Sequence, residues 1–153
     1  MRLRLSVLTV LVALLAGSSH VAAAADVNTF VPVTGPTPDD CNSEVVEITG
    51  QLHVVMHMTG SLSGGFHFDS VDNFANVKGV GLTTGINYTV TDTTHTDFNI
   101  VDGLTFTTTI TEAHQVNSVG PTPNFFLHDV LHVTFNENGP SAFVDNIRFG
   151  CTP

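Results

Sequence analysis

A regular alternation of apolar and polar residues is the feature that most constrains the fold of this chain. Between residues 46 and 59 six of the seven apolar side chains fall on even positions, and most odd positions carry Glu, Thr, Gln or His. Successive side chains of a β-strand point to opposite faces, so a period of two predicts a strand with one buried face. An amphipathic helix would instead repeat every 3.6 residues or so. The apolar positions are Val46, Ile48, Leu52, Val54, Met56 and Met58.

Further segments rich in Val, Ile, Phe and Thr follow along the chain, and these residues favour strands. We predict eight strands, at 44–59, 66–71, 74–83, 86–92, 95–101, 104–116, 125–136 and 141–149. Because the connections between them are short, the strands are expected to form an antiparallel meander.

The turns predict which residues face each other across the strands. Three-residue loops ending in glycine at 137–139 and 101–103 place Val133 opposite Phe143 and Ile100 opposite Leu104. A first hairpin turning around Leu62 would place Met58 opposite Phe66. These registers predict one buried face that includes Met56, Met58, Phe66, Phe68, Leu131, Val133, Phe135 and Ile147.

The N-terminus has the three-part pattern of a secretory signal peptide. Arg2 and Arg4 precede a short apolar run, and small residues close the segment at residues 22–25. We therefore predict a signal peptide at 1–25, a Pro, Thr and Asp-rich tether at 26–43, and a single β-domain at 44–153. The protein is expected to be secreted, and no later segment is long and apolar enough to predict a membrane helix.

The chain contains two cysteines, Cys41 and Cys151. In an exported protein we expect them to form a disulfide, because they lack the close spacing of metal-binding or redox motifs. Such a bond would join the start of the first strand to the end of the last. We therefore favour a meander closed into a barrel, with a two-sheet β-sandwich as the alternative.

The charge of the chain excludes two classes of partner. Removal of the leader would leave Lys78 and Arg148 as the cations, against all 14 carboxylates, for a formal charge of -12. Nucleic acids and anionic lipids bind clustered Lys or Arg, so neither is an expected partner. The acidic residues are scattered, which is typical of a solvated surface.

Histidines form the most specific functional pattern. His53, His57, His67, His128 and His132 all fall on the face opposite the predicted core. With the first hairpin turning around Leu62, His57 would stand opposite His67, close enough to share a metal ion. We therefore consider a cross-strand zinc or copper site built from His57 and His67, with His53 and His132 as further candidates, against the alternative of a plain polar face without a cofactor.

No catalytic residues are assigned, because the sequence has no nucleophile elbow and its carboxylates cannot be paired by spacing alone. Several stretches, QLHVVMHM, GGFHF, GVGLTTGINY and HDVLHVTFNENG, together with Cys41 and Cys151, resemble a family of small exported bacterial β-proteins of uncharacterised function. The resemblance covers the whole mature chain and implies no activity, substrate or cofactor.

Three functions remain open from the sequence. The first is a secreted, non-catalytic β-barrel module that binds a small molecule or an extracellular or cell-surface partner. The second is a metal-binding protein or metalloenzyme that uses the histidine face. The third is a structural or adhesive envelope domain.

Overall fold

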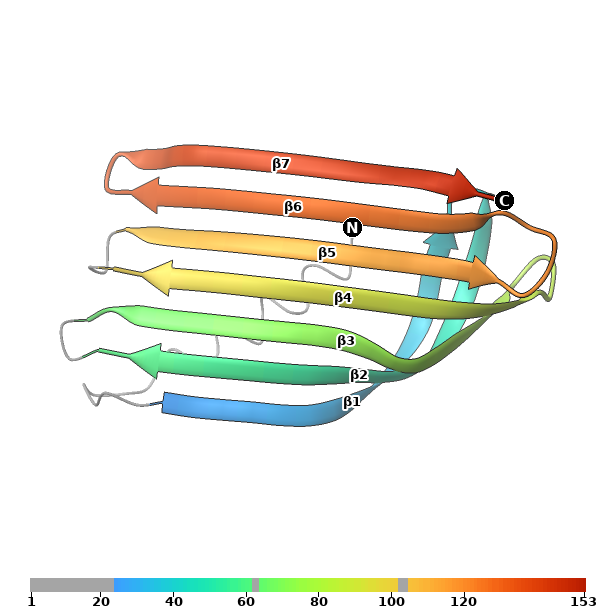
Figure 1. The fold of residues 1–153 in the computed structure, drawn as a ribbon, viewed down its shortest axis with the longest axis horizontal. Coiled ribbons are helices and arrows are strands. Elements are labelled where there is room, and N and C mark those ends of the chain that lie inside the picture. Colours follow the sequence, from blue (N-terminus) through green and yellow to red (C-terminus); the bar gives the residue numbers. More distant parts are fainter. Residues whose placement is uncertain (1–23, 62–63, 102–104) are drawn as a thin grey trace.

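The computed structural model describes residues 24–61, 64–101 and 105–153, and these form one antiparallel sheet of seven strands. Each strand pairs with its neighbours in the sequence, in the order β1 to β7 (Figure 1). The predicted all-β meander is therefore confirmed. The strands are β1 (Ala24–Asp39), β2 (Glu44–Gly60), β3 (Phe66–Gly81), β4 (Asn87–Ile100), β5 (Phe106–Ser118), β6 (Asn124–Asn136) and β7 (Gly139–Thr152).

The strands differ in number and length from the prediction. Segments 66–71 and 74–83 are parts of β3, and segments 86–92 and 95–101 are parts of β4. Most of the expected tether at 26–43 belongs to β1, which pairs with β2 despite Pro32, Pro36 and Pro38. Proline is tolerated there because β1 is an edge strand, whose outward side needs no hydrogen bonds. The predicted signal peptide lies almost entirely outside the described residues.

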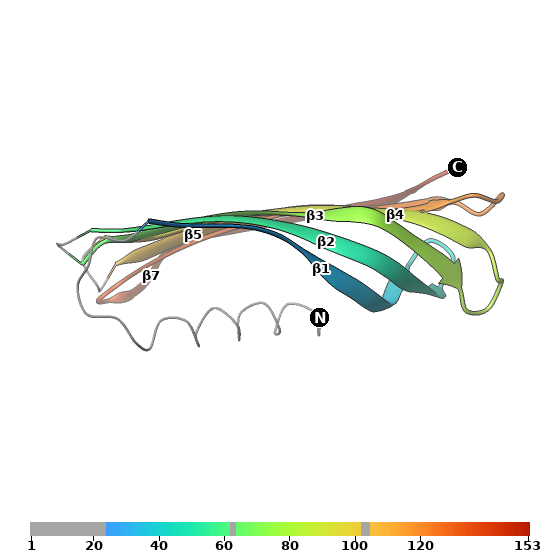
Figure 2. The ribbon, with the colours of Figure 1, turned by 90° about the horizontal axis from the view of Figure 1, so that it is seen from below.

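The sheet is nearly flat at one end and rolls up at the other, where the β1–β2 hairpin curls under β3–β6 (Figure 2). Register shifts between Thr49 and Gln51, and between Asn73 and Lys78, mark the two bends. Such bulges bend a strand and increase its twist. Asn76 adopts a φ of 56° within the second bulge, a left-handed conformation that asparagine tolerates better than most residues.

We call the face enclosed by this bend the inner face, and the opposite one the outer face. At the rolled end the inner face forms the hydrophobic core, made of Val46, Ile48, Val77, Tyr88, Val90, Val116 and Phe125. Gly79 allows the close packing of this core, because a Cβ atom there would lie 2.3 Å from Cγ1 of Val46. The predicted disulfide is confirmed: it joins Cys41 to Cys151 with a Cα–Cα distance of 5.6 Å.

The other end of the sheet, where β2 ends at Gly60 and β3 begins at Phe66, is the open end. Here the described strands form a single layer, and β1 and β7 are the two free edges (Figure 2). The sheet is not closed into a barrel over the described residues, so the predicted barrel is not confirmed. These residues also form one sheet rather than the two of a sandwich.

Two turns at the open end are longer than predicted, which moves the cross-strand partners by two residues. Met58 pairs with Phe68 instead of Phe66, and Ile100 pairs with Phe106 instead of Leu104, which lies outside the described residues. A shift of two keeps every side chain on its predicted face, because the strand period is also two. At the β6–β7 turn the predicted pairing of Val133 with Phe143 is confirmed.

The predicted buried face is correct in position but only partly buried. Phe68 and Val133 are buried, whereas Ile147 on the edge strand β7 is 49% exposed. The other predicted residues are half-buried: Met56, Met58, Phe66, Leu131 and Phe135. In the described part of the chain, no helix is long and apolar enough to cross a membrane.

Candidate functional site

The outer face carries the histidines singled out from the sequence, but the register separates them. His57 pairs with Asp69, and His67 pairs with Thr59, so the prediction that His57 faces His67 is wrong. The cause is the longer β2–β3 turn. His132 lies on β6, four strands away from β2, a distance of about 19 Å at the usual strand spacing.

Four of these histidines, His53, His57, His67 and His132, instead contact a polar side chain on a neighbouring strand. His53 Nε2 lies 2.8 Å from Asn28 Oδ1, and His57 Nδ1 contacts the Asp26 carboxylate. His67 Nδ1 lies 2.6 Å from Asn99 Oδ1, and His132 Nδ1 lies 2.8 Å from Thr109 Oγ1. The imidazoles therefore connect β1 to β2, β3 to β4 and β5 to β6, as cross-strand polar pairs do in many sheets.

The densest group of potential ligands on the outer face lies on β3 and β4. Asp69 and Asp97 are direct register partners, His95 Nε2 lies 2.6 Å from Asp69 Oδ2, and His67 Nδ1 lies 3.8 Å from Asp97 Oδ2. His95 is not among the five histidines singled out from the sequence. Across the described residues, no three His, Cys, Asp or Glu side chains are placed to hold a metal ion.

The inner face contains acidic residues that the sequence analysis did not assign to it. Asp72, Thr94, Glu112 and Asp129 are successive register partners and form a row across β3 to β6. Burial raises the pKa of Asp72, and the nearby Asp92 raises it further, against a smaller lowering by the hydrogen bond from Ser70. These acids occupy positions in phase with the apolar residues, a signal that was present in the sequence.

A histidine of the inner face connects the β1–β2 hairpin to the sheet. His114 Nδ1 lies 3.1 Å from Asp92 Oδ2, and its Nε2 lies 3.5 Å from Thr37 Oγ1 on β1. An acid, an imidazole and a hydroxyl in this order resemble a catalytic triad. The imidazole, however, is buried between the rings of Phe74 and Phe125, at centroid distances of 6.3 and 6.4 Å. The arrangement fixes the hairpin over the core.

Glu44 is a buried acid that organises the turn between β3 and β4. Its carboxylate accepts hydrogen bonds from the backbone N–H groups of Thr83 and Thr84, the Thr84 hydroxyl and the Tyr88 hydroxyl, at 2.7–3.1 Å. Burial alone raises the pKa of Glu44, but these four bonds outweigh it and lower the pKa overall. All of its partners belong to the chain itself, so the geometry gives Glu44 a structural role.

Phenylalanines form a row across the inner face at the open end. Phe66, Phe98, Phe106 and Phe135 lie on β3, β4, β5 and β6, with successive ring centroids 6.4, 5.7 and 4.7 Å apart. On β7, the next strand, Phe143 is 66% exposed. Alternation placed Phe66 and Phe135 on a buried core face, whereas the four rings of the row are half-buried in a single layer.

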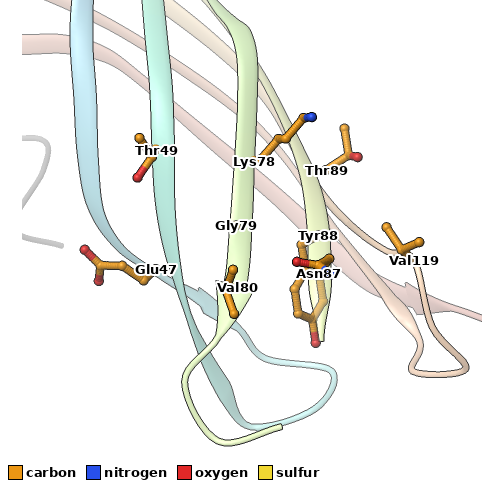
Figure 3. A pocket seen from close by; sticks show the side chains of 9 residues that line it. All are labelled: Glu47, Thr49, Lys78, Gly79, Val80, Asn87, Tyr88, Thr89 and Val119. Atoms are coloured by element: carbon orange, nitrogen blue, oxygen red, sulfur yellow. The ribbon is translucent and has the colours of Figure 1, made fainter. Parts of the chain in front are cut away.

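Two open hollows lie beside these features. One, of about 460 Å³, lies over the outer side of β2–β4 at the rolled end; Figure 3 shows Lys78 and Glu47 at its sides and Tyr88 below. The other, of about 350 Å³, lies at the open end between the ends of β2, β3 and β4 and includes His67 and Asn99. Both are open to solvent, unlike the enclosed clefts that bury a small ligand.

In comparisons with known proteins, no family model, curated protein or solved structure matches the chain.

Proposed function

We propose that this chain is an exported, non-catalytic binding module that docks a macromolecular surface onto the inner face of its open end. The observation that carries the proposal is the row of four phenylalanine rings on a single-layer sheet. Aromatic side chains dominate the energy of protein interfaces because they bury a large apolar area with little loss of conformational freedom.

The shape of this face favours a broad partner over a small molecule. The rings extend across four strands and continue to Phe143 on β7. A small ligand is usually held in a concave cleft that covers most of its surface, whereas a flat sheet face matches another extended surface. The polar residues of the same face, such as Glu112 and Asp129, lie nearer the middle of the sheet and would border the contact.

Export is part of the proposal. The Cys41–Cys151 disulfide supports it, because disulfides persist in oxidising compartments outside the cytoplasm. The signal-peptide pattern of residues 1–25 supports it as well. We further propose that barrel-like closure is confined to the rolled end, where the disulfide connects the first hairpin to the last strand.

The proposal is tested by retention of the folded protein on an octyl-agarose surface and by binding of the neutral apolar dye Nile red. The test variant is Phe106→Gln, which removes the ring that contacts both Phe98 and Phe135. The matched control is Thr107→Gln, one residue further along β5 and on the outer face. Circular dichroism checks that both variants keep their strands.

We expect Phe106→Gln to lose retention and to reduce dye fluorescence several-fold, with Thr107→Gln behaving like the unmodified protein. Equal retention and fluorescence in all three proteins would show that the phenylalanine row is not an accessible binding surface. An assay of metal content after purification without a histidine tag tests the alternative function, because the outer-face histidines would then retain zinc or copper.

A further inference from the structure

The two edges of the sheet differ in how they are protected. β1 carries three prolines, which lack the N–H groups that an added strand would need. β7 has one, Pro140, next to its first residue, and its side chains at 141–149 are exposed on both faces. Phe143 and Phe149 on this strand are 66% and 71% exposed. An exposed apolar edge of this length is a surface for pairing with another strand.

We propose that two copies of this chain pair antiparallel through β7, about a two-fold axis at Asn146. The inference goes beyond the proposed function, because it concerns the sheet edge and holds whether or not the inner face binds a partner. The axis is perpendicular to the sheet, so both copies keep their inner faces on the same side. Two such sheets would form one sheet of 14 strands, because each copy contributes seven.

The sequence of β7 is complementary to itself in this register. Phe143 of each copy stands opposite Phe149 of the other, which gives two cross-strand aromatic pairs on the inner face. Val144 of each copy stands opposite Arg148 of the other on the outer face, and the two Asn146 residues stand opposite each other. The register also uses almost the whole strand, because Pro140 then meets Thr152 at each end. Moving the axis by one residue to Asp145 would place two carboxylates directly opposite each other.

Charge also favours β7 over the rest of the surface. The described residues contain two cations, Lys78 and Arg148, and Arg148 lies on β7. Together with Asp145 it makes this strand formally neutral within a strongly acidic chain. Two copies therefore repel each other least along this edge. The β1–β2 hairpin does not obstruct the contact, because it ends behind β7 and not beyond its outer edge (Figure 1).

Disulfide cross-linking tests the register. In the Asn146→Cys variant the two new thiols would lie directly opposite each other, at the Cβ separation of about 5 Å typical of facing residues. In the matched Val144→Cys variant they would be about 13 Å apart, too far to bond. We expect mild oxidation to convert Asn146→Cys to covalent dimer and to leave Val144→Cys monomeric, with Cys41–Cys151 intact in both by peptide mapping.

Sedimentation equilibrium of the secreted protein tests the association itself. We expect twice the monomer mass at protein concentrations above about 10 µM. Asn146→Lys, which sets two like charges opposite each other on the axis, should give the monomer mass. Thr29→Lys, which adds the same charge to the exposed edge β1, should leave the dimer unchanged. A monomer in the unmodified protein, a dimer that resists Asn146→Lys, or equal cross-linking of both cysteine variants would overturn the proposal.

Discussion

The rolled end and the open end are made by the same strands but pack differently. On β4, Val90 at the rolled end is buried in the core, whereas Ile100 at the open end is half-buried on the same face. At the rolled end the bulges in β2 and β3 bring a second layer of the same sheet over the inner face. Alternation therefore determines which face is apolar, while bulges and the disulfide determine where that face is covered.

The disulfide gives the largest expected difference between the two ends. Replacing both cysteines, as Cys41→Ser with Cys151→Ser, should lower the free energy of unfolding by about 4 kcal/mol, because the bond spans 110 residues of the chain. Urea denaturation measures the change, and reduction of the unmodified protein should reproduce it. Hydrogen exchange should rise mainly at the rolled end. An unchanged urea midpoint would mean that the rolled end holds together without the bond.

Truncation of one core residue at each end tests the difference in packing. Val116→Ala, at a side chain that is 0% exposed, should cost about 2 to 3 kcal/mol of unfolding free energy. Leu131→Ala removes a larger side chain from the half-buried open end and should cost only about 1 kcal/mol, because partly exposed atoms lose less on truncation. A greater loss at Leu131 in urea denaturation would show that the open end is covered in solution.

Glycine substitutions provide a second comparison of the ends. Gly79→Ala would place a Cβ atom 2.3 Å from Cγ1 of Val46, so the core must shift at a cost of about 1 to 3 kcal/mol. Gly60→Ala at the open end meets its nearest atom, the Gly65 carbonyl oxygen, at 4.0 Å. We expect this second variant to unfold at nearly the unmodified midpoint. Equal thermal midpoints for the two variants would argue against the tight contact between β2 and β3.

The sequence predicted the faces of the strands much better than their partners. Its alternation placed Met58, Phe68 and Val133 on one face, and the two-residue errors in turn length could not change this result. The same errors moved the cross-strand neighbours at these two hairpins, which removed the expected contact between His57 and His67. Turn length depends on local backbone geometry, so composition alone could not predict it.

Three further features could not be predicted from the alternation pattern. The prolines of residues 32–38 suggested a tether, because proline is excluded from central strands, but an edge strand tolerates it. Asp72 and Asp129 fall in the apolar phase of their strands, yet burial of acids could not be distinguished from an irregularity in the pattern. The hydrogen bonds of Glu44 join it to residues about 40 positions later in the chain, such as Thr84, and no local sequence pattern predicts them.

Glu44 makes the stability of the rolled end dependent on pH. Because its hydrogen bonds lower its pKa in the folded state, its contribution is fully present above the unfolded pKa of about 4.3 and is lost as the pH falls through the folded pKa. We expect the urea midpoint to fall on acidification below about pH 5. Glu44→Gln should flatten this part of the profile and lower the midpoint at neutral pH. An identical profile in the variant would remove Glu44 as the source.

The pH dependence of stability that Asp72 contributes should have the opposite sign to that of Glu44 and should be the smallest of these effects. Burial and the neighbouring Asp92 raise its folded pKa, so its contribution to stability is present below the unfolded pKa and is lost as the pH rises through the folded one. Asp72→Asn keeps a hydrogen-bond acceptor for the Ser70 hydroxyl, which lies 3.0 Å from Oδ1, and removes the charge. At neutral pH this variant should be more stable by less than about 1 kcal/mol, and near pH 3 the gain should disappear.

Asp145→Asn, at an exposed carboxyl on β7, is the control and should leave the stability unchanged both at neutral pH and near pH 3. A loss of stability at neutral pH in Asp72→Asn would mean that the charge is stabilised by the inner face, and the acidic row would then be a favourable part of the sheet instead of a cost at its centre.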